Sequence, residues 1–176
     1  MYENKASEVS EEINRNNYPQ RKSPRADFHD YSGGDYFVTI CTREKKCYFG
    51  YIRDSKMYFT KIGYYCQQQL EEISEHYPYA ENLSYVVMPN HIHMILHINP
   101  HAVNEQLPET RTLLSVIIGG LKRAVSIYAR RNNIDFEWQS RYHDHIIRNS
   151  HDGNKITEYV ANNVGRWETD CFNLKK

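Results

Sequence analysis

The alternation of apolar and polar positions is clearest from Val86 to Ile98, which reads Val-Val-Met-Pro-Asn-His-Ile-His-Met-Ile-Leu-His-Ile. Two runs rich in β-forming residues flank Pro89-Asn90, a pair that breaks strands and favours turns, so this stretch predicts strand, tight turn, strand. Side chains alternate between the two faces of a strand. One face of the second strand therefore carries the side chains expected in the core, which are Ile92, Met94, Leu96 and Ile98. The other face carries His91, His93, Ile95 and His97.

The same patterns predict the other elements. Strands are expected at residues 36–42 and, as a small hairpin, at 48–52 and 56–60. Helices are expected at 62–76, at 112–131 and after the capping residues 149–152, with a short strand ending the stretch 137–148. This order predicts an α+β fold, with helices packed on a ferredoxin-like (RRM-like) antiparallel sheet. We expect a flexible tail at 1–20, one domain at 21–170 and a carboxyl-terminal tail at 171–176.

Composition narrows the class of protein. The 176 residues carry a formal net charge of zero, so no global electrostatic field indicates a nucleic-acid partner. Four cysteines without a Cys-x-x-Cys pair, and a polar amino terminus without a signal peptide, favour reduced thiols in a cytoplasmic protein. No apolar run approaches the length of a membrane span, so a membrane partner is not expected.

Basic residues nevertheless gather in two places. The stretch 111–148 is rich in Lys and Arg and poor in acids, and residues 18–25 form a basic arm. A charged surface is usually only solvated, and the arm could equally be a solvated leader. As contacts to DNA phosphates, the candidates are Arg21, Lys22, Lys122, Arg123, Arg130 and Arg131.

Candidate metal chemistry comes from His91 and His93. On one face of a strand they are roughly 6.5 to 7 Å apart along the chain, so both rings can converge on one divalent metal about 2 Å from each nitrogen. A His-x-His pair on a strand is also common without metal, and two ligands do not make a site. An amide oxygen of Asn163 would supply a third, and Tyr159, one helical turn earlier, would stand beside the metal.

Several other polar residues are candidates for the same site. His97 lies about 13 Å from His93 along the strand, too far for the same metal. His143 and His145 precede the last helix, where packing, solvation and an approach to DNA all remain open. Tyr142 is the rival nucleophile, but it lacks a ligand partner at helical spacing.

These motifs resemble those of the single-tyrosine HUH transposases, and of the REP-associated tyrosine transposases in particular. The resemblance rests on Pro89-Asn90-His91-Ile92-His93, on 36–42, and on Trp138-Gln139 followed by Glu158-Tyr159-Val160-Ala161-Asn162-Asn163. It implies that His91, His93 and Asn163 hold Mg²⁺ or Mn²⁺ and that Tyr159 is the nucleophile. The family usually places Pro after that Asn; here it is Val164, a departure that concerns the helix end because Pro supplies no ligand.

The resemblance also implies an activity. Tyr159 would attack single-stranded DNA beside a hairpin, giving a 5′-phosphotyrosine and a free 3′-OH that can rejoin strands without ATP. The implied partner is hairpin-bearing single-stranded DNA, and the implied location is the cytoplasm, in association with the nucleoid. Monomer and homodimer stay open. So do two other functions: a catalytically silent DNA-binding regulator, and a metal-dependent hydrolase that uses water.

Overall fold

The computed structural model describes residues 33–103 and 111–174. The predicted tail at 1–20 and the basic arm with Arg21 and Lys22 lie outside the described residues. The sheet has the order β4–β5–β1–β6, with all neighbours antiparallel. Its strands are β1 (Gly34–Cys41), β4 (Ala80–Val87), β5 (His91–Ile98) and β6 (His143–Ile147). With the helices between β1 and β4 and between β5 and β6, this order confirms the predicted α+β, ferredoxin-like class.

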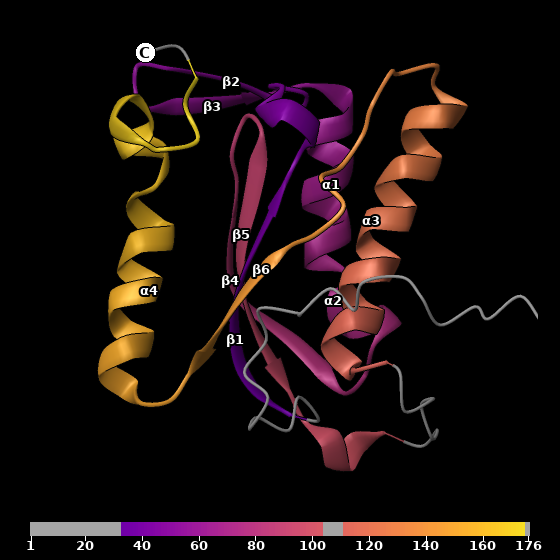
Figure 1. The fold of residues 1–176 in the computed structure, drawn as a ribbon, viewed down its shortest axis with the longest axis vertical. Helices are drawn as coiled ribbons and strands as arrows, with labels where there is room; N and C mark the ends of the chain where they lie inside the picture. The colour runs from indigo at the N-terminus through magenta and orange to yellow at the C-terminus, as the bar shows by residue number, and fades with distance from the viewer. Residues whose placement is uncertain (1–32, 104–110, 175–176) are drawn as a thin grey trace, which may run out of the picture.

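The helices lie on opposite faces of the sheet (Figure 1). On one face lie α1 (Lys61–Glu71), α2 (Ile73–His76) and α3 (Leu113–Arg131). On the other face lies α4 (Ser150–Asn162), which contacts β4, β5 and β6. Short 3₁₀ turns complete the chain at η1 (Arg43–Lys45), η2 (Pro100–Ala102) and η3 (Val164–Thr169).

The core lies between the sheet and the α1–α3 layer. The predicted core set of β5 is buried, with Ile92, Met94 and Leu96 fully excluded from solvent and Ile98 1% exposed. Each such side chain contributes about 1.5–3 kcal/mol through burial. The other face of β5 is also covered near its start, because α4 packs there, and only His97 is exposed.

The predicted helix at 62–76 is broken at Glu72, where φ is −86° and ψ is 6°. Next to the break, the side-chain amide of Asn82 donates a 2.9 Å hydrogen bond to the Leu70 carbonyl from β4. This bond satisfies a carbonyl of the last helical turn from outside the helix, so the chain can turn there and bury Ile73 in α2.

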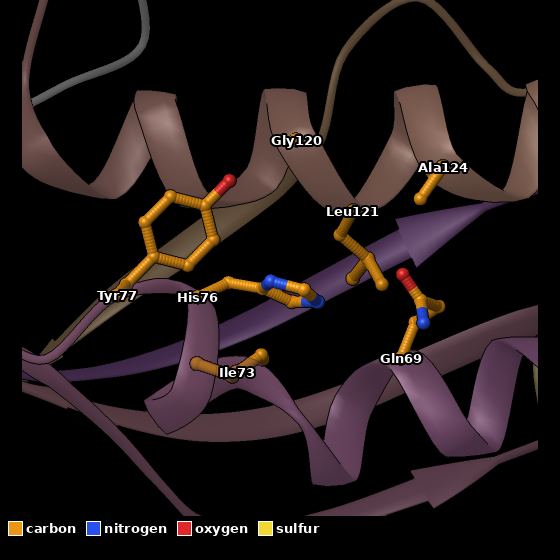
Figure 2. Close-up of a pocket in the computed structure, with 7 residues that line it drawn as sticks. All are labelled: Gln69, Ile73, His76, Tyr77, Gly120, Leu121 and Ala124. Carbon is orange, nitrogen blue, oxygen red and sulfur yellow. The ribbon is translucent and has the colours of Figure 1, made fainter.

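Close packing explains one glycine of α3. A β-carbon on Gly120 would lie 1.8 Å from the Tyr77 hydroxyl oxygen, whereas one on Gly119 would meet nothing within 4 Å. Figure 2 shows the Tyr77 hydroxyl directed at Gly120 across a groove of about 360 Å³ between α1–α2 and α3. Of the two adjacent glycines, Gly120 is therefore the one that close packing requires.

Three further expectations concern the cysteines, membrane spans and the small hairpin. All four cysteines are free, as expected for reduced thiols. Among residues 33–103 and 111–174, no helix combines the length and apolarity needed to cross a bilayer. A second, two-stranded sheet, β2 (Gly50–Arg53) with β3 (Lys56–Phe59), is inserted between β1 and α1, as the hairpin prediction required.

Candidate active site

His91 and His93 are the first and third residues of β5, and their rings lie on the sheet face that α4 covers. The ring centroids are 4.6 Å apart, and the side chains are buried, with 0% and 2% of their surfaces exposed. Their predicted convergence is therefore observed. Two buried imidazoles this close could share one ion.

Hydrogen bonds orient His91 and fix its tautomer. Its Nδ1 lies 2.8 Å from Oδ1 of Asn90. The amide nitrogen of Asn90 donates to the Lys45 carbonyl at 2.9 Å and the Phe172 carbonyl at 2.8 Å, which turns Oδ1 toward the imidazole. Because an amide oxygen only accepts, Nδ1 carries the proton. The Nε2 lone pair of His91 is left buried without a hydrogen-bond partner.

His93 is held in a similar way from the neighbouring strand. Its Nδ1 lies 2.8 Å from the hydroxyl of Thr39, the residue opposite it on β1. Its Nε2 lies 3.3 Å from the hydroxyl oxygen of Tyr159. The Thr39 hydroxyl can accept from Nδ1, and in that tautomer Nε2 accepts from Tyr159. The Phe37 ring stacks on the imidazole at 5.2 Å and holds its plane.

Asn163 brings an amide to the same place from the end of α4. It is 1% exposed, and its Oδ1 has no hydrogen-bond partner. Within the described residues three buried side-chain atoms lack a partner: His91 Nε2, Asn163 Oδ1 and Asn82 Oδ1. Such an atom costs about 1–3 kcal/mol. Two of the three therefore occur together at this site.

These donor atoms fit a divalent cation. A lone pair on nitrogen and a carbonyl-type oxygen are ligands for Mn²⁺ and Mg²⁺, which complete their shells with water and substrate oxygens. The described residues contain no cluster of three or more His, Cys, Asp and Glu side chains suited to a metal. The fit therefore depends on the amide of Asn163 as the third ligand.

The ionisation of the site follows from burial. Burial lowers the pKa of His91 to about 2, assisted by the nearby His93 and Lys45, and it lowers the pKa of His93 to about 4. Both rings are thus neutral near pH 7, the state that ligates metal. Burial raises the pKa of the Tyr159 hydroxyl, while the side chain of Asn163 opposes this. The phenol therefore keeps its proton until a positive charge stabilises the phenolate.

The other predicted candidates lie outside this cluster. His97 is paired at 2.7 Å with Asp35, and His145 at 2.8 Å with Asp152. His143 is exposed at the start of β6, on the same sheet face as Thr39. The rival nucleophile Tyr142 is half-buried and packs against the hydrophobic core instead.

The predicted DNA-contacting residues are spread more widely. The Lys122 ammonium donates to the carbonyls of Gln139 and Ser140, and burial lowers its pKa. Arg123, Arg130 and Arg131 are exposed on α3. That helix lies across the sheet from α4, so these cations are not gathered around Tyr159 (Figure 1).

Several side chains of the site were missed in the sequence. Thr39 and Asn90 orient the two imidazoles, and the Phe172 ring packs against His91 in a tilted arrangement with a centroid distance of 4.4 Å. Asn90 stands in the recognised motif, but only as a turn former. The signal for Thr39 was the alternation along β1, which turns its side chain to the same sheet face as the His93 ring on the neighbouring strand β5. Phe172 lies in the predicted carboxyl-terminal tail and gives no periodic signal.

The sequence has identifiable relatives. A protein of Haemophilus influenzae described as uncharacterized is 35% identical over 164 residues, which are 85% of this chain and 91% of that protein. A second Haemophilus influenzae protein, provisionally named a REP-associated tyrosine transposase, is 27% identical over 142 residues, 74% of this chain and 70% of that protein. No protein-family model matches the sequence.

Solved structures share the fold. The structure of a REP-associated tyrosine transposase bound to a REP hairpin has a TM-score of 0.56 and 20% sequence identity, covering 81% of this chain and 74% of that one. The fold and the sequence relatives agree with the motif resemblance. The chain belongs to the same family as the first of these Haemophilus influenzae proteins, and it resembles the REP-associated tyrosine transposases in its motifs and its fold.

Proposed function

We propose that this protein is a transposase-type enzyme that nicks and joins single-stranded DNA next to a hairpin, with Tyr159 as nucleophile. The observation that carries the proposal is that two buried, unpartnered ligand atoms, His91 Nε2 and Asn163 Oδ1, accompany the His93–Tyr159 pair, with the Asn163 side chain hydrogen-bonded to Tyr159. A tyrosine that served only for packing would not need two unpartnered ligand atoms beside it.

The residues have separate roles. His91, His93 and Asn163 would hold Mg²⁺ or Mn²⁺, which supplies positive charge to polarise a phosphodiester and stabilise its non-bridging oxygens. Asn90 holds His91 in the tautomer that exposes Nε2, and the Thr39 hydroxyl orients His93 and can accept from its Nδ1 to the same effect. The Tyr159 hydroxyl, 3.3 Å from His93 Nε2, would then lie beside the scissile phosphate.

The proposed reaction is a transesterification. The Tyr159 hydroxyl oxygen forms a bond to phosphorus and gives up its proton, the bond to the 3′ oxygen breaks, and that oxygen leaves as a hydroxyl. The products are a 5′-phosphotyrosine and a free 3′ end. Because one phosphodiester replaces another, the 3′-OH of the same or a different strand can attack the phosphotyrosine and restore a DNA bond without ATP.

A hairpin partner is supported by the related structure, which holds a REP hairpin. In this chain the exposed Arg123, Arg130 and Arg131 are candidate contacts to hairpin phosphates, as are Arg21 and Lys22 outside the described residues. Lys122 is the weakest candidate, because its ammonium already binds two carbonyls.

The test is a search for the covalent adduct. The protein is incubated with Mn²⁺ and hairpin-bearing single-stranded DNA labelled on the 3′ side of the cut, and denaturing gels are read for labelled protein. We expect an adduct from wild type and from Tyr142→Phe, and none from Tyr159→Phe. Cleavage without any adduct would indicate a water-using hydrolase, and binding without cleavage a silent regulator. An adduct on Tyr142 would overturn the assignment of the nucleophile.

A further inference from the structure

The two-stranded ribbon β2–β3 has an inner and an outer face. Its register pairs Tyr51 with Tyr58 and Arg53 with Lys56, and alternation places these four side chains together. Ile52, Met57 and Phe59 fall on the inner face and are half-buried. We call Tyr51, Arg53, Lys56 and Tyr58 the ribbon's outer face. All four are exposed, and Tyr51 and Tyr58 are among the few large hydrophobic side chains left open, at 53% and 36%.

The two tyrosines form an exposed aromatic pair. Their rings stack with centroids 5.2 Å apart and planes 12° apart. The Arg53 guanidinium lies 5.3 Å from the centroid of the Tyr58 ring and 3.9 Å from the Asp54 carboxylate. A cross-strand pair of aromatic residues stabilises a ribbon. That role does not require the rings to stay open to solvent with two cations around them.

The ribbon is bonded to the segment that leads into β5 and faces the segment that follows Asn163. The Phe49 amide, one residue before β2, donates at 3.0 Å to the carbonyl of Pro89, two residues before His91. A cavity of about 380 Å³ separates the ribbon tip at 52–55 from residues 164–169, which directly follow Asn163. Figure 1 shows the ribbon at the same end of the molecule as the start of β5 and the end of α4.

Close packing holds the ribbon rigidly against the start of α1. The Phe49 carbonyl accepts a 2.9 Å hydrogen bond from the Thr60 amide at the start of α1. A β-carbon on Gly63 would lie 2.0 Å from that same carbonyl oxygen, so only glycine allows the ribbon to approach α1 this closely. The outer face is therefore held at a set position relative to His91.

Flat rings beside cations match unpaired bases on a phosphate backbone. Aromatic side chains bind single-stranded nucleic acid by stacking on successive bases, and neighbouring Lys and Arg side chains contact the phosphates. Lys61 at the start of α1 adds a third exposed cation close to Arg53 and Lys56 in sequence. Duplex DNA offers no such open base faces.

We propose that the ribbon's outer face is a stacking platform for unpaired bases of the DNA strand that enters or leaves the active site. The proposal rests on the proposed function for its substrate class, and it assigns Tyr51 and Tyr58 a part in binding, not in the bond-making step.

The test compares two strands of equal charge. Affinity of the full chain is measured by fluorescence anisotropy for an oligothymidylate and for an abasic oligomer of the same length. Each stacked base contributes about 1–3 kcal/mol, so Tyr51→Ala and Tyr58→Ala should each weaken oligothymidylate binding about fivefold or more. The same variants should bind the abasic strand as wild type does. Tyr51→Phe and Tyr58→Phe keep the ring and should keep the affinity.

The matched control is Tyr64→Ala, which removes a more exposed tyrosine (63%) from α1 outside the ribbon's outer face. It should leave oligothymidylate affinity close to wild type. If an alanine variant fails to unfold cooperatively, Tyr51→Leu and Tyr58→Leu retain an apolar cross-strand pair without an aromatic face and are expected to lose affinity alike.

Three outcomes would overturn the platform: unchanged affinity in the alanine or leucine variants, an equal loss on the abasic strand, or normal DNA binding with altered self-association in sedimentation velocity. The last would identify a contact between proteins.

The adduct assay on the same preparations separates this proposal from the proposed function. Adduct formation by wild type with unchanged affinity in the variants removes the platform alone. A missing adduct removes the nuclease assignment, while the anisotropy comparison still decides whether the ribbon stacks on bases.

Discussion

The hydroxyl oxygen of Tyr159 lies 3.3 Å from Nε2 of His93, so the candidate nucleophile and a candidate metal ligand share one hydrogen bond. A cation held by that nitrogen would take the lone pair to which the phenol now donates. The tyrosine would then be released from the imidazole at the moment when a positive charge beside it favours its ionised form.

The first prediction concerns the cation itself. Mn²⁺ should raise the thermal unfolding temperature of wild type, because a ligand that binds only the folded state stabilises it by about 2.7 kcal/mol at a hundred times its Kd. His91→Ala and Asn163→Ala should remove most of this shift, as measured by differential scanning fluorimetry. His97→Ala is the control, since its ring is paired with Asp35 elsewhere on β5. An undiminished Mn²⁺ shift in His91→Ala would place the cation at another site.

The second prediction concerns the residue behind His93. Thr39→Val keeps the shape of the side chain but removes the hydroxyl 2.8 Å from His93 Nδ1. Losing such an orienting partner typically costs 10–100-fold in metal affinity, on the order of 1–3 kcal/mol. Titration calorimetry with Mn²⁺ should show this loss. The control is Thr157→Val on α4, whose hydroxyl bonds only the Gly153 carbonyl of its own helix. Equal Mn²⁺ affinity in wild type and Thr39→Val would mean that packing alone orients His93.

The third prediction concerns acid stability of the metal-free protein. Burial lowers the folded-state pKa of His91 to about 2 and of His93 to about 4, against about 6.5 in an unfolded chain. Below pH 6.5 the unfolded state therefore binds more protons, and the free energy of unfolding falls as the pH drops. Well below pH 6.5, each imidazole contributes about 1.4 kcal/mol per pH unit to the slope of the unfolding free energy. The contribution of His93 ends as the pH falls to its folded-state pKa of about 4.

Urea unfolding between about pH 7 and about pH 5 measures that slope. His91→Gln should reduce the slope of the unfolding free energy against pH by the contribution of one imidazole. An unchanged slope in His91→Gln would assign the loss of stability to other groups.

The fourth prediction uses the adjacent glycines of α3. Gly119→Ala adds a methyl group where nothing lies within 4 Å and should stabilise the helix by up to about 1 kcal/mol. Gly120→Ala places the same methyl group 1.8 Å from the Tyr77 hydroxyl oxygen, so Tyr77 must move and stability should fall. Urea unfolding of the two variants compares one substitution at neighbouring positions. Equal effects would mean that Tyr77 shifts at no cost.

The fifth prediction concerns salt. Binding of hairpin DNA should weaken steeply as salt rises, because each phosphate contact releases counterions. Charge reversal at Arg123 and Arg130 should make the slope of log affinity against log salt shallower. Arg53→Glu, at the ribbon, should do so for an oligothymidylate. If reversal at Arg123 and Arg130 leaves the hairpin slope unchanged, the hairpin does not bind to α3.

Much of this structure could be predicted from local pattern. Alternation alone placed His91 and His93 on one face of a buried strand, because a one-residue change in parity would have exposed Ile92 and Met94. Helical spacing alone placed Tyr159 and Asn163 on one stripe of the last helix. Side-chain convergence between β5 and α4 followed from the family resemblance, since periodicity says nothing about which elements meet.

The features that the sequence did not predict depend on tertiary contacts. The break at Glu72 reflects the Asn82 bond to Leu70, which comes from a strand ten residues later in the chain. Lys122 looked like a free cation of α3, but the loop at 139–140 returns over it and takes its ammonium. The hydrogen bonds of Asn90 to Lys45 and Phe172 join segments far apart in sequence, which no local pattern encodes.

The position of β1 between β5 and β6 has a consequence for the rate of folding. Thr39 meets His93 across 54 positions of sequence, and its other neighbour, His143, comes from a still later strand. β1 therefore forms its hydrogen bonds to β5 and β6 only when long loops close. This slows folding relative to helical bundles of similar length. Until those loops close, a newly made chain leaves both edges of β1 open to pairing with another copy, so production of this protein should be sensitive to concentration and temperature.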